Sequence, residues 1–249
     1  MEKYVLLTLN YRLFMPNPFF SFKKFTVYHD RCAMKVGTDG VLLGAWANLS
    51  NSQYVLDIGT GTGLITLMLA QRNENIQITA IDIDQEAVEQ AEENFISSPW
   101  KDRINVKLQD VVTYQPINLF DTIVSNPPYF TNSLKCPNEQ RSTARHTDTL
   151  SIDNLLARSS ELLSEKGKVS FVFPYDQTEK IIQIAQREGL FLSRYTKVKP
   201  RPDLPPKRSL LEFGKEKVNC EANELTIELS RHIYTDDYIA LTRDFYLKM

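Results

Sequence analysis

The sequence predicts an α/β fold in which helices flank a mostly parallel β-sheet. Short apolar runs of strand length alternate with stretches of helical periodicity along most of the chain. A glycine-rich turn, Gly59 to Gly63, follows the first buried run and precedes a helical stretch. The length of 249 residues and the 42% hydrophobic content suit one large domain of this class with small additions.

The expected elements follow one another along the chain. Strands are predicted at Tyr54–Ile58, Ile76–Asp82, Ile104–Gln109, Phe120–Ser125, Lys168–Phe173 and Leu190–Lys197, and near Leu210–Gly214 and Leu225–Leu229. Helices are predicted at Leu64–Ala70, Gln85–Ile96, Ile152–Leu163 and Gln177–Arg187, with a further one that buries Leu42, Leu43 and Trp46. Residues 164–167 are typical of a helix-end turn, with glycine at its last position.

The turn after the first strand favours S-adenosylmethionine as its ligand. Its pattern, Asp57-Ile58-Gly59-Thr60-Gly61-Thr62-Gly63, departs from the Gly-x-Gly-x-x-Gly pattern of dinucleotide-binding turns. Glycines let the backbone approach a ligand and adopt positive φ. Asp57 would repel a pyrophosphate, whereas it would attract the ammonium group that S-adenosylmethionine carries and NAD lacks. We therefore assign Asp57, Gly59, Thr60, Gly61 and Gly63 to the cofactor site.

Acidic residues also end the next two strands. Asp82, about twenty residues beyond the glycines, is at the position that usually holds a ribose diol; Ile83 is assigned to the site with it. Asp84 competes for that role and is otherwise the N-cap of the following helix. Asp110 can accept a hydrogen bond from the adenine amine while Val111 packs on the ring. Each acid alone could be an ordinary turn residue, but three in this order indicate a cofactor site.

The tetrapeptide Asn126-Pro127-Pro128-Tyr129 follows the strand Phe120–Ser125 and is typical of enzymes that methylate a planar nitrogen. The lone pair of such a nitrogen is delocalised, so the nitrogen is a poor nucleophile. The Asn126 side-chain oxygen and the Pro127 carbonyl can accept both of its hydrogens and localise the lone pair. The prolines fix the backbone, and Tyr129 can stack on a flat substrate. An isolated Asn-Pro would more simply be a turn.

With these motifs, the chain resembles the class I S-adenosylmethionine-dependent methyltransferases. The segment 25–46 and the ending 238–249 are similar to the family of bacterial tRNA(Val) adenine-37 N6-methyltransferases. The resemblance implies a Rossmann-like, seven-stranded, mostly parallel sheet with an antiparallel strand at its end. It also implies that Lys35, Thr38 and Asp39 line the methionine end of the cofactor pocket. Read from the residues alone, Thr38 or Asp39 is a helix N-cap. The catalytic domain would span residues 25–249, after an extension, 1–24, without family pattern.

Basic residues gather in two segments that could contact RNA. Residues 194–217 contain eight basic residues against three acidic ones, around a proline-rich stretch. We assign Lys199, Arg201, Lys207 and Arg208 to phosphate contacts, although a solvated connector between two strands explains the charge equally well. Arg141 and Arg145 lie in the segment 131–148, which would order over a flipped base.

Composition excludes other classes of protein. The formal net charge of −2 argues against indiscriminate nucleic-acid binding. Three cysteines, 32, 136 and 220, are far apart and predict reduced thiols in a cytoplasmic protein. The three histidines are isolated, so no metal site is expected. No apolar run approaches the roughly twenty residues that cross a membrane.

The sequence thus predicts an S-adenosylmethionine-dependent enzyme that methylates N6 of an adenine in tRNA, with adenine 37 of tRNA(Val) implied by the resemblance. A protein glutamine N5-methyltransferase is the closest alternative, because a glutamine amide poses the same electronic problem. That family usually carries a longer helical domain before the cofactor motif than the roughly fifty residues present here. DNA adenine and ribosomal guanine methyltransferases share the catalytic chemistry. A noncatalytic RNA-binding protein on the same scaffold is a weaker alternative.

Overall fold

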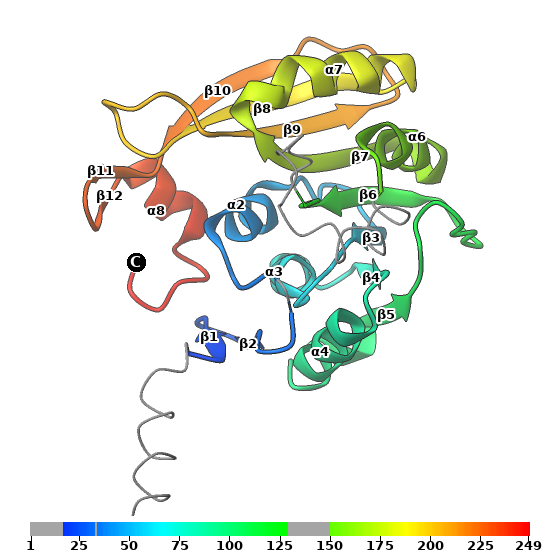
Figure 1. Ribbon diagram of the computed structural model, residues 1–249, viewed down its shortest axis with the longest axis horizontal. Helices are drawn as coiled ribbons and strands as arrows, with labels where there is room; N and C mark the ends of the chain where they lie inside the picture. The colour runs from blue at the N-terminus through cyan, green and yellow to red at the C-terminus, as the bar shows by residue number, and fades with distance from the viewer. Residues whose placement is uncertain (1–16, 33, 129–149) are drawn as a thin grey trace, which may run out of the picture.

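One β-sheet runs through the molecule and carries helices on both faces (Figure 1). The computed structural model describes residues 17–32, 34–128 and 150–249. The sheet has the strand order β10-β8-β9-β7-β6-β3-β4-β5. Its strands are β3 (Tyr54–Ile58), β4 (Gln77–Asp82), β5 (Ile104–Leu108), β6 (Phe120–Ser125), β7 (Leu163–Pro174), β8 (Phe191–Lys199), β9 (Arg208–Gly214) and β10 (Glu221–Thr226).

The helices and small strands complete the architecture. The helices are α2 (Thr38–Trp46), α3 (Leu64–Arg72), α4 (Gln85–Ile96), α6 (Ile152–Leu162), α7 (Thr178–Arg187) and α8 (Asp236–Thr242), with single 3-10 turns η1 (Lys101–Arg103) and η2 (Tyr175–Gln177). Two short hairpins pair β1 (Phe19–Ser21) with β2 (Thr26–Tyr28), and β11 (Glu228–Ser230) with β12 (Ile233–Tyr234).

The strand directions confirm the predicted fold class. The strands β5, β4, β3, β6 and β7 are mutually parallel. The strand β9 is antiparallel to both β7 and β8, and β10 pairs parallel to β8 and adds an eighth strand at that end. The sheet thus has eight strands where seven were expected, and the reversed strand lies between β7 and β8 instead of at the end of the sheet. The carboxyl ends of all the parallel strands meet at one edge of the sheet.

Separate hydrophobic clusters form on the two faces because parallel strands are buried on both sides. On β3, Leu56 belongs to the cluster shared with α6 and α7, which includes Leu155 and Ile181. Its neighbour Val55 belongs to the cluster shared with α2, α3 and α8. Each of these four side chains is fully buried. Alternate residues of one strand thus hold the two helical layers.

The predicted turn over residues 164–167 is wrong, because β7 begins directly after α6. The pairing of β7 with β6 is irregular here, with Phe120 opposite Leu163 and Thr122 opposite Lys168. A Cβ on Gly167 would lie 2.9 Å from the carbonyl oxygen of Phe120. Gly167 therefore permits close approach of β7 to β6, and the four residues 164–167 of β7 lie opposite the single residue Asp121 of β6, as an irregularity in the strand.

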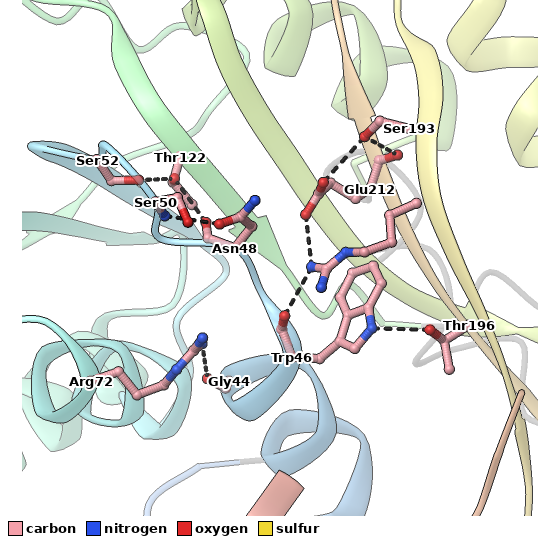
Figure 2. A network of polar contacts seen from close by, with 11 residues as sticks. Gly44, Trp46, Asn48, Ser50, Ser52, Arg72, Thr122, Ser193, Thr196 and Glu212 are labelled. Carbon is pink, nitrogen blue, oxygen red and sulfur yellow. Dashed lines mark hydrogen bonds and ion pairs between the residues drawn. The ribbon is translucent and has the colours of Figure 1, made fainter. Parts of the chain in front are cut away.

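A buried polar network fixes the carboxyl end of α2 to the sheet (Figure 2). The guanidinium of Arg194 lies 3.7 Å from the centre of the Trp46 ring, and it donates to the Trp46 carbonyl at 2.9 Å and to Glu212 at 2.8 Å. The Trp46 indole donates to Thr196 at 3.0 Å. The helix that carries Thr38 and Asp39 at its other end is thereby held against β8 and β9.

The β1–β2 hairpin packs against the carboxyl end of the chain. Phe22 and Phe25 are buried and their rings stack at 4.7 Å. The backbone N–H of Lys23 donates to the Phe245 carbonyl at 2.8 Å. The predicted boundary after residue 24 falls between the two strands of this hairpin. The division into an extension and a domain stays a prediction.

Candidate active site

The glycine turn and the tetrapeptide leave the sheet side by side. Strands β3 and β6 are neighbours, and Ile58 is paired with Ser125. The Ser125 hydroxyl also donates to the Ile58 carbonyl at 2.8 Å. Gly59 and Asn126 directly follow the last residues of the two strands. The pairing therefore brings the two motifs together at the carboxyl edge of the sheet.

A cavity of about 480 Å³ opens at this edge and is lined by most of the residues that the sequence assigned to the cofactor and to catalysis. Those residues are Gly59, Gly61, Asp82, Ile83, Asp110, Val111, Asn126, Pro127 and Pro128. Asn126 is half-buried and Pro127 is buried. Tyr129 lies outside the described residues. The geometry thus gathers residues from the ends of four strands into one site.

The backbone N–H groups of the glycine turn are engaged within the protein. Those of Gly59 and Thr60 donate to the Ile81 carbonyl at 2.9 and 3.1 Å. That of Gly61 donates to the Asp82 carboxylate at 2.8 Å. Turns that bind a pyrophosphate instead direct such groups at the ligand. The hydrogen bonding therefore agrees with the sequence argument against a dinucleotide.

The glycines of the turn serve two purposes. Gly59, Gly61 and Gly63 have φ values of 70°, 54° and 80°, which disfavour residues with a Cβ. A Cβ on Gly59 or Gly61 would meet no described atom within 4 Å and would enter open space at the cavity. A Cβ on Gly63 would lie 2.4 Å from the Phe95 ring. The first two glycines leave room for a ligand, whereas the third lets α4 pack closely.

Asp57 is a fully buried carboxylate beside the glycine turn. One oxygen, Oδ2, accepts from the hydroxyls of Thr60 at 2.8 Å and Thr66 at 2.7 Å. The other, Oδ1, has no hydrogen-bond partner among the described residues. Burial raises the pKa of Asp57 to about 6, against the lowering effect of the two threonines. Asp57, Thr60 and Gly63 are not among the described residues that line the cavity, so these three assignments stay predictions. The orphaned oxygen of Asp57 has the charge that the ammonium group of an amino acid requires.

Asp82 and Asp84 have different partners. Asp82 accepts from the backbone N–H of Gly61 through Oδ2 and from that of Asp84 through Oδ1, at 2.8 and 3.1 Å. Asp84 accepts from the backbone N–H of Glu86 at 3.0 Å and is the N-cap of α4. The N-cap alternative for Asp84 is confirmed, although the residue also lines the cavity. Asp82 is held by two backbone donors with its carboxylate at the cavity.

Apolar side chains and the carboxylate-bearing residue Asp110 also line the cavity. Asp110 accepts from the backbone N–H of Val112 at 2.8 Å. Val111 is buried, whereas Ile83, Val112 and Met34 are 57%, 39% and 51% exposed while lining the cavity. Exposed apolar groups around a concave site suit a flat ring. Together with Asp110 in the same cavity, they fit an adenine group with an amine on its edge.

Several lining residues were not foreseen from the sequence, namely Cys32, Met34, Gln109, Val112, Leu150 and Asn154. Cys32 and Met34 fall inside the segment that resembles the tRNA methyltransferase family, which was the available signal. Leu150 and Asn154 have no local pattern. Burial and the nearby Asp82 and Asp84 raise the pKa of the Cys32 thiol to about 11. That thiol is therefore neutral and a poor nucleophile.

Lys35, Thr38 and Asp39 are not among the described residues that line the cavity. The helix α2 begins after Gly37, and no described side chain caps it, so the N-cap alternative for Thr38 or Asp39 is wrong. Asp39 instead accepts from the Nε of Arg208 at 2.9 Å. Lys35 and Thr38 are exposed. Their contact with the cofactor stays a prediction.

The basic proline-rich segment connects β8 and β9 at the same edge of the sheet as the cavity. It contains a turn closed by the Leu204 N–H and the Arg201 carbonyl at 3.1 Å. Lys199 and Arg201 form ion pairs with Glu224 and Asp203 at 3.6 and 3.2 Å. The remaining two candidates are Lys207, which is exposed, and Arg208, which contacts Asp39. Arg141 and Arg145 lie outside the described residues.

Within residues 17–32, 34–128 and 150–249, there is no group of three histidine, cysteine, aspartate or glutamate residues that could hold a metal ion. No helix of those segments is long and apolar enough to span a membrane.

Comparisons with known proteins agree with the geometry of the site. Residues 36–182 match the family model of the methyltransferase small domain. The chain is similar to the protein called tRNA1(Val) (adenine(37)-N6)-methyltransferase in three bacteria. It is 57% identical to that of Phocaeicola vulgatus, over 94% of this chain and 100% of the relative. The corresponding values are 54%, 94% and 100% for Bacteroides fragilis, and 46%, 92% and 96% for Vibrio vulnificus.

Solved structures show the same fold. A predicted O-methyltransferase from Agrobacterium tumefaciens has a TM-score of 0.66 at 19% identity, with 83% of this chain and 96% of that chain covered. A protein described as an RNA methyltransferase from Pyrococcus horikoshii has a TM-score of 0.52 at 18% identity, with 72% and 82% covered. At these identities, the likeness concerns the architecture alone.

Proposed function

The chain belongs to the tRNA1(Val) (adenine(37)-N6)-methyltransferase family, within the methyltransferases of the small-domain type, and we propose that it methylates N6 of adenine 37 in a valine tRNA. The family predicted from the sequence is confirmed. One structural observation supports the chemistry above all others: the pairing of Ile58 with Ser125 brings the turn at Gly59 next to Asn126. A methyl donor and a planar nitrogen held by these two motifs would meet at one edge of the sheet.

The described residues fit S-adenosylmethionine as the donor. Asp82 would accept from the ribose hydroxyls, Asp110 from the adenine amine, and Asp57 would face the ammonium group. The apolar side chains of Ile83 and Val111 would flank the adenine ring. When bound, this cofactor supplies an electrophilic methyl group on a positively charged sulfur. The open space beside Gly59 suits its approach.

Asn126 and Pro127 would prepare the acceptor. The Asn126 side-chain oxygen and the Pro127 carbonyl would each accept one hydrogen of the target amine, drawing the nitrogen towards tetrahedral geometry. Ser125 holds the preceding backbone through its bond to Ile58. The attacking amine is neutral, so its surplus proton can leave after transfer, and a strong base is unnecessary. Stacking of the base on Tyr129 stays a prediction.

The tRNA would approach the carboxyl edge of the sheet. Lys199, Arg201 and Lys207 belong to the β8–β9 connection, which leaves the sheet at this edge. Phosphate contacts from such residues fix the position of an RNA without reading its sequence. Arg141 and Arg145 remain candidates for the same role. A tRNA substrate also implies a cytoplasmic enzyme.

The proposal is tested with radiolabelled S-adenosylmethionine and total RNA from cells that lack the gene. Digestion should yield labelled N6-methyladenosine, and sequencing should place it at position 37 of a valine tRNA. Asn126→Ala should lower turnover by ~10²-fold or more, while binding of S-adenosylhomocysteine, the product of the cofactor, should persist. Asn223→Ala, an exposed change on β10, is the matched control and should leave turnover unchanged.

The same experiment separates the alternatives. Label on a protein glutamine that depends on Asn126, with none on RNA, would favour a glutamine N5-methyltransferase. Tight RNA binding without label on either substrate would indicate a noncatalytic RNA-binding protein. Near-normal turnover of Asn126→Ala would contradict the catalytic assignment itself.

A further inference from the structure

A buried amide on α4 connects two segments that both belong to the cavity wall. The side chain of Asn94 is 1% exposed. Its Oδ1 accepts from the backbone N–H of Tyr28 at 2.9 Å, and its Nδ2 donates to the carbonyls of Tyr28 and Thr62, each at 2.9 Å. Both amide hydrogens and the amide oxygen are therefore engaged with backbone groups far away in the sequence.

Both partners of Asn94 lie close along the chain to lining residues. Thr62 is inside the glycine turn, next to Gly61, which lines the cavity. Tyr28 ends β2, and the chain that follows reaches Cys32 and Met34, which also line the cavity. One side chain thus joins the glycine turn to the segment that leads to Cys32 and Met34.

A second buried amide of α4 supports the same segment. Gln90 is 1% exposed, and its Oε1 accepts from the backbone N–H of Arg31 at 3.3 Å. The Arg31 guanidinium also contacts Glu93, at 2.7 and 2.8 Å. This ion pair is exposed and contributes little by itself. The backbone of residues 28–31 is therefore held to α4 at two points, one turn of helix apart.

We propose that Asn94 is a positioning residue for the cofactor: through Tyr28 and Thr62 it holds the two walls of the cavity at the spacing that S-adenosylmethionine requires. The inference rests on the proposed function, because it takes this cavity to be the cofactor site. Buried amides are usually hydrogen-bonded for the sake of the fold alone. If Asn94 positions the cofactor, variants of Asn94 that remain folded must also bind the cofactor more weakly.

The test compares Asn94→Asp and Asn94→Ala with the wild-type chain. Aspartate keeps the size and the acceptor but loses both Nδ2 hydrogen bonds, and it would face the carbonyls of Tyr28 and Thr62. For each variant, KM for S-adenosylmethionine should rise by about 10- to 100-fold, the scale on which supporting residues act, while kcat at saturating cofactor should stay within about threefold, as expected for lost ground-state binding. KM for tRNA should not change. Glu92→Ala, on the exposed face of the same helix, is the matched control.

A second readout does not depend on methyl transfer. Titration calorimetry with S-adenosylhomocysteine, without RNA, should show Kd rising in parallel with KM. Thermal unfolding of the same samples shows whether each variant is folded. If Asn94→Ala does not unfold cooperatively, Gln90→Ala carries the test, because it removes one contact to residues 28–31, and Kd should then rise several-fold.

The two ways of failing are distinct. Failure of the wild-type chain to bind S-adenosylhomocysteine would overturn the proposed function and the inference together. If the wild type binds and the folded variants bind equally well, Asn94 has only a structural role and the inference alone is overturned. A fall in kcat with unchanged KM and Kd would also overturn it.

Discussion

The Nε of Arg208 donates to the Oδ2 of Asp39 across 2.9 Å, joining the first residue of β9 to the first turn of α2. The two side chains are 31% and 23% exposed, so water screens the pair only in part. From the sequence, Asp39 was assigned to the cofactor and Arg208 to RNA. Their contact couples a helix beside the cofactor motif to the connection expected to bind tRNA.

This pair should contribute to stability as a unit. Asp39→Asn and Arg208→Gln should each lower the free energy of unfolding, and the double variant should lose less than the sum by about 1 kcal/mol. Urea unfolding at pH 7.5 measures all four proteins. The exposed pair Asp203→Asn and Arg201→Gln, whose members are 66% and 42% exposed, is the control and should show coupling near zero. Equal coupling in the two cycles would contradict the prediction.

Cofactor affinity should depend on pH through Asp57. Its pKa is raised to about 6 by burial, so the free protein holds this carboxyl protonated below that pH. An ammonium ligand requires the carboxylate, so binding is coupled to loss of the proton. The association constant for S-adenosylhomocysteine should therefore fall by up to about tenfold per pH unit below pH 6, and level off above it.

Calorimetry between pH 5 and 8 tests this dependence. Asp57→Asn should bind more weakly at pH 7.5 and should lose the step near pH 6, whereas Asp102→Asn on η1 should keep it. The pH dependence of folding stability has the opposite sign to that of ligand binding. Because the folded pKa lies above the unfolded value of 3.8, the contribution of Asp57 to folding is present below pH 3.8 and is lost as pH rises towards 6. If the binding of S-adenosylhomocysteine by Asp57→Asn still changed near pH 6, that change would belong to another titratable group.

Substitution by alanine should have different effects on affinity and stability at Gly59 and at Gly63. Gly59→Ala places a Cβ in open space at the cavity, at a φ of 70°, so it should cost about 1 kcal/mol of stability and at least tenfold in cofactor affinity. Gly189→Ala is the matched control, with a φ of 74° and no described atom within 4 Å, and it should lower stability equally without affecting affinity. Denaturant unfolding and calorimetry measure both quantities.

Gly63→Ala should act mainly on the fold. Its Cβ would lie 2.4 Å from the Phe95 ring, so α4 must shift or the backbone must change. We expect a loss of about 2–3 kcal/mol in unfolding free energy, because overpacking of a buried site adds to the strain of a side chain at positive φ. The double variant Gly63→Ala with Phe95→Leu should recover part of that loss. Equal stability of Gly59→Ala and Gly63→Ala would show that the contact with Phe95 is relieved at no cost.

The β8–β9 connection should contribute to the salt dependence of tRNA binding. Lys207 is exposed at the carboxyl edge of the sheet, so Lys207→Gln should lower the slope of log affinity against log salt by about 1. Lys166→Gln is the control, because Lys166 lies in the amino-terminal part of β7. Filter binding at several salt concentrations gives both slopes. Identical slopes for the two variants would leave the connection without an RNA contact at Lys207.

Sequence patterns at the carboxyl ends of the strands were the best predictors of the site. The ranges Tyr54–Ile58 and Phe120–Ser125 were predicted as they occur, because apolar runs bounded by a glycine turn and a proline pair are unambiguous. The positions of Gly59 and Asn126 in the cavity follow from those ends. In contrast, the start of β7 was misplaced, because residues 164–167 continue the strand as an irregularity opposite Asp121 of β6, which the local turn pattern does not reveal.

Contacts between distant segments could not be foreseen. Asp39 and Arg208 are 169 residues apart, and nothing near either residue specifies the other. In the sequence, Asn94 is an ordinary polar residue of a helix. Its amide nevertheless contacts Tyr28 and Thr62, which are 66 and 32 positions away in the chain. Such pairs depend on how the hairpin and the helices pack, which periodicity does not encode.

The pairing of Ile58 with Ser125 has a consequence for changing what the enzyme acts on. The motifs proposed to hold the methyl donor and the acceptor are aligned by two paired strands, so under this proposal the geometry of methyl transfer does not depend on how the substrate is recognised. New targets can then be sought by exchanging the surfaces around the cavity while β3 and β6 stay untouched. A one-residue insertion in either strand would instead slip the register and separate the two motifs, however well the substrate was bound.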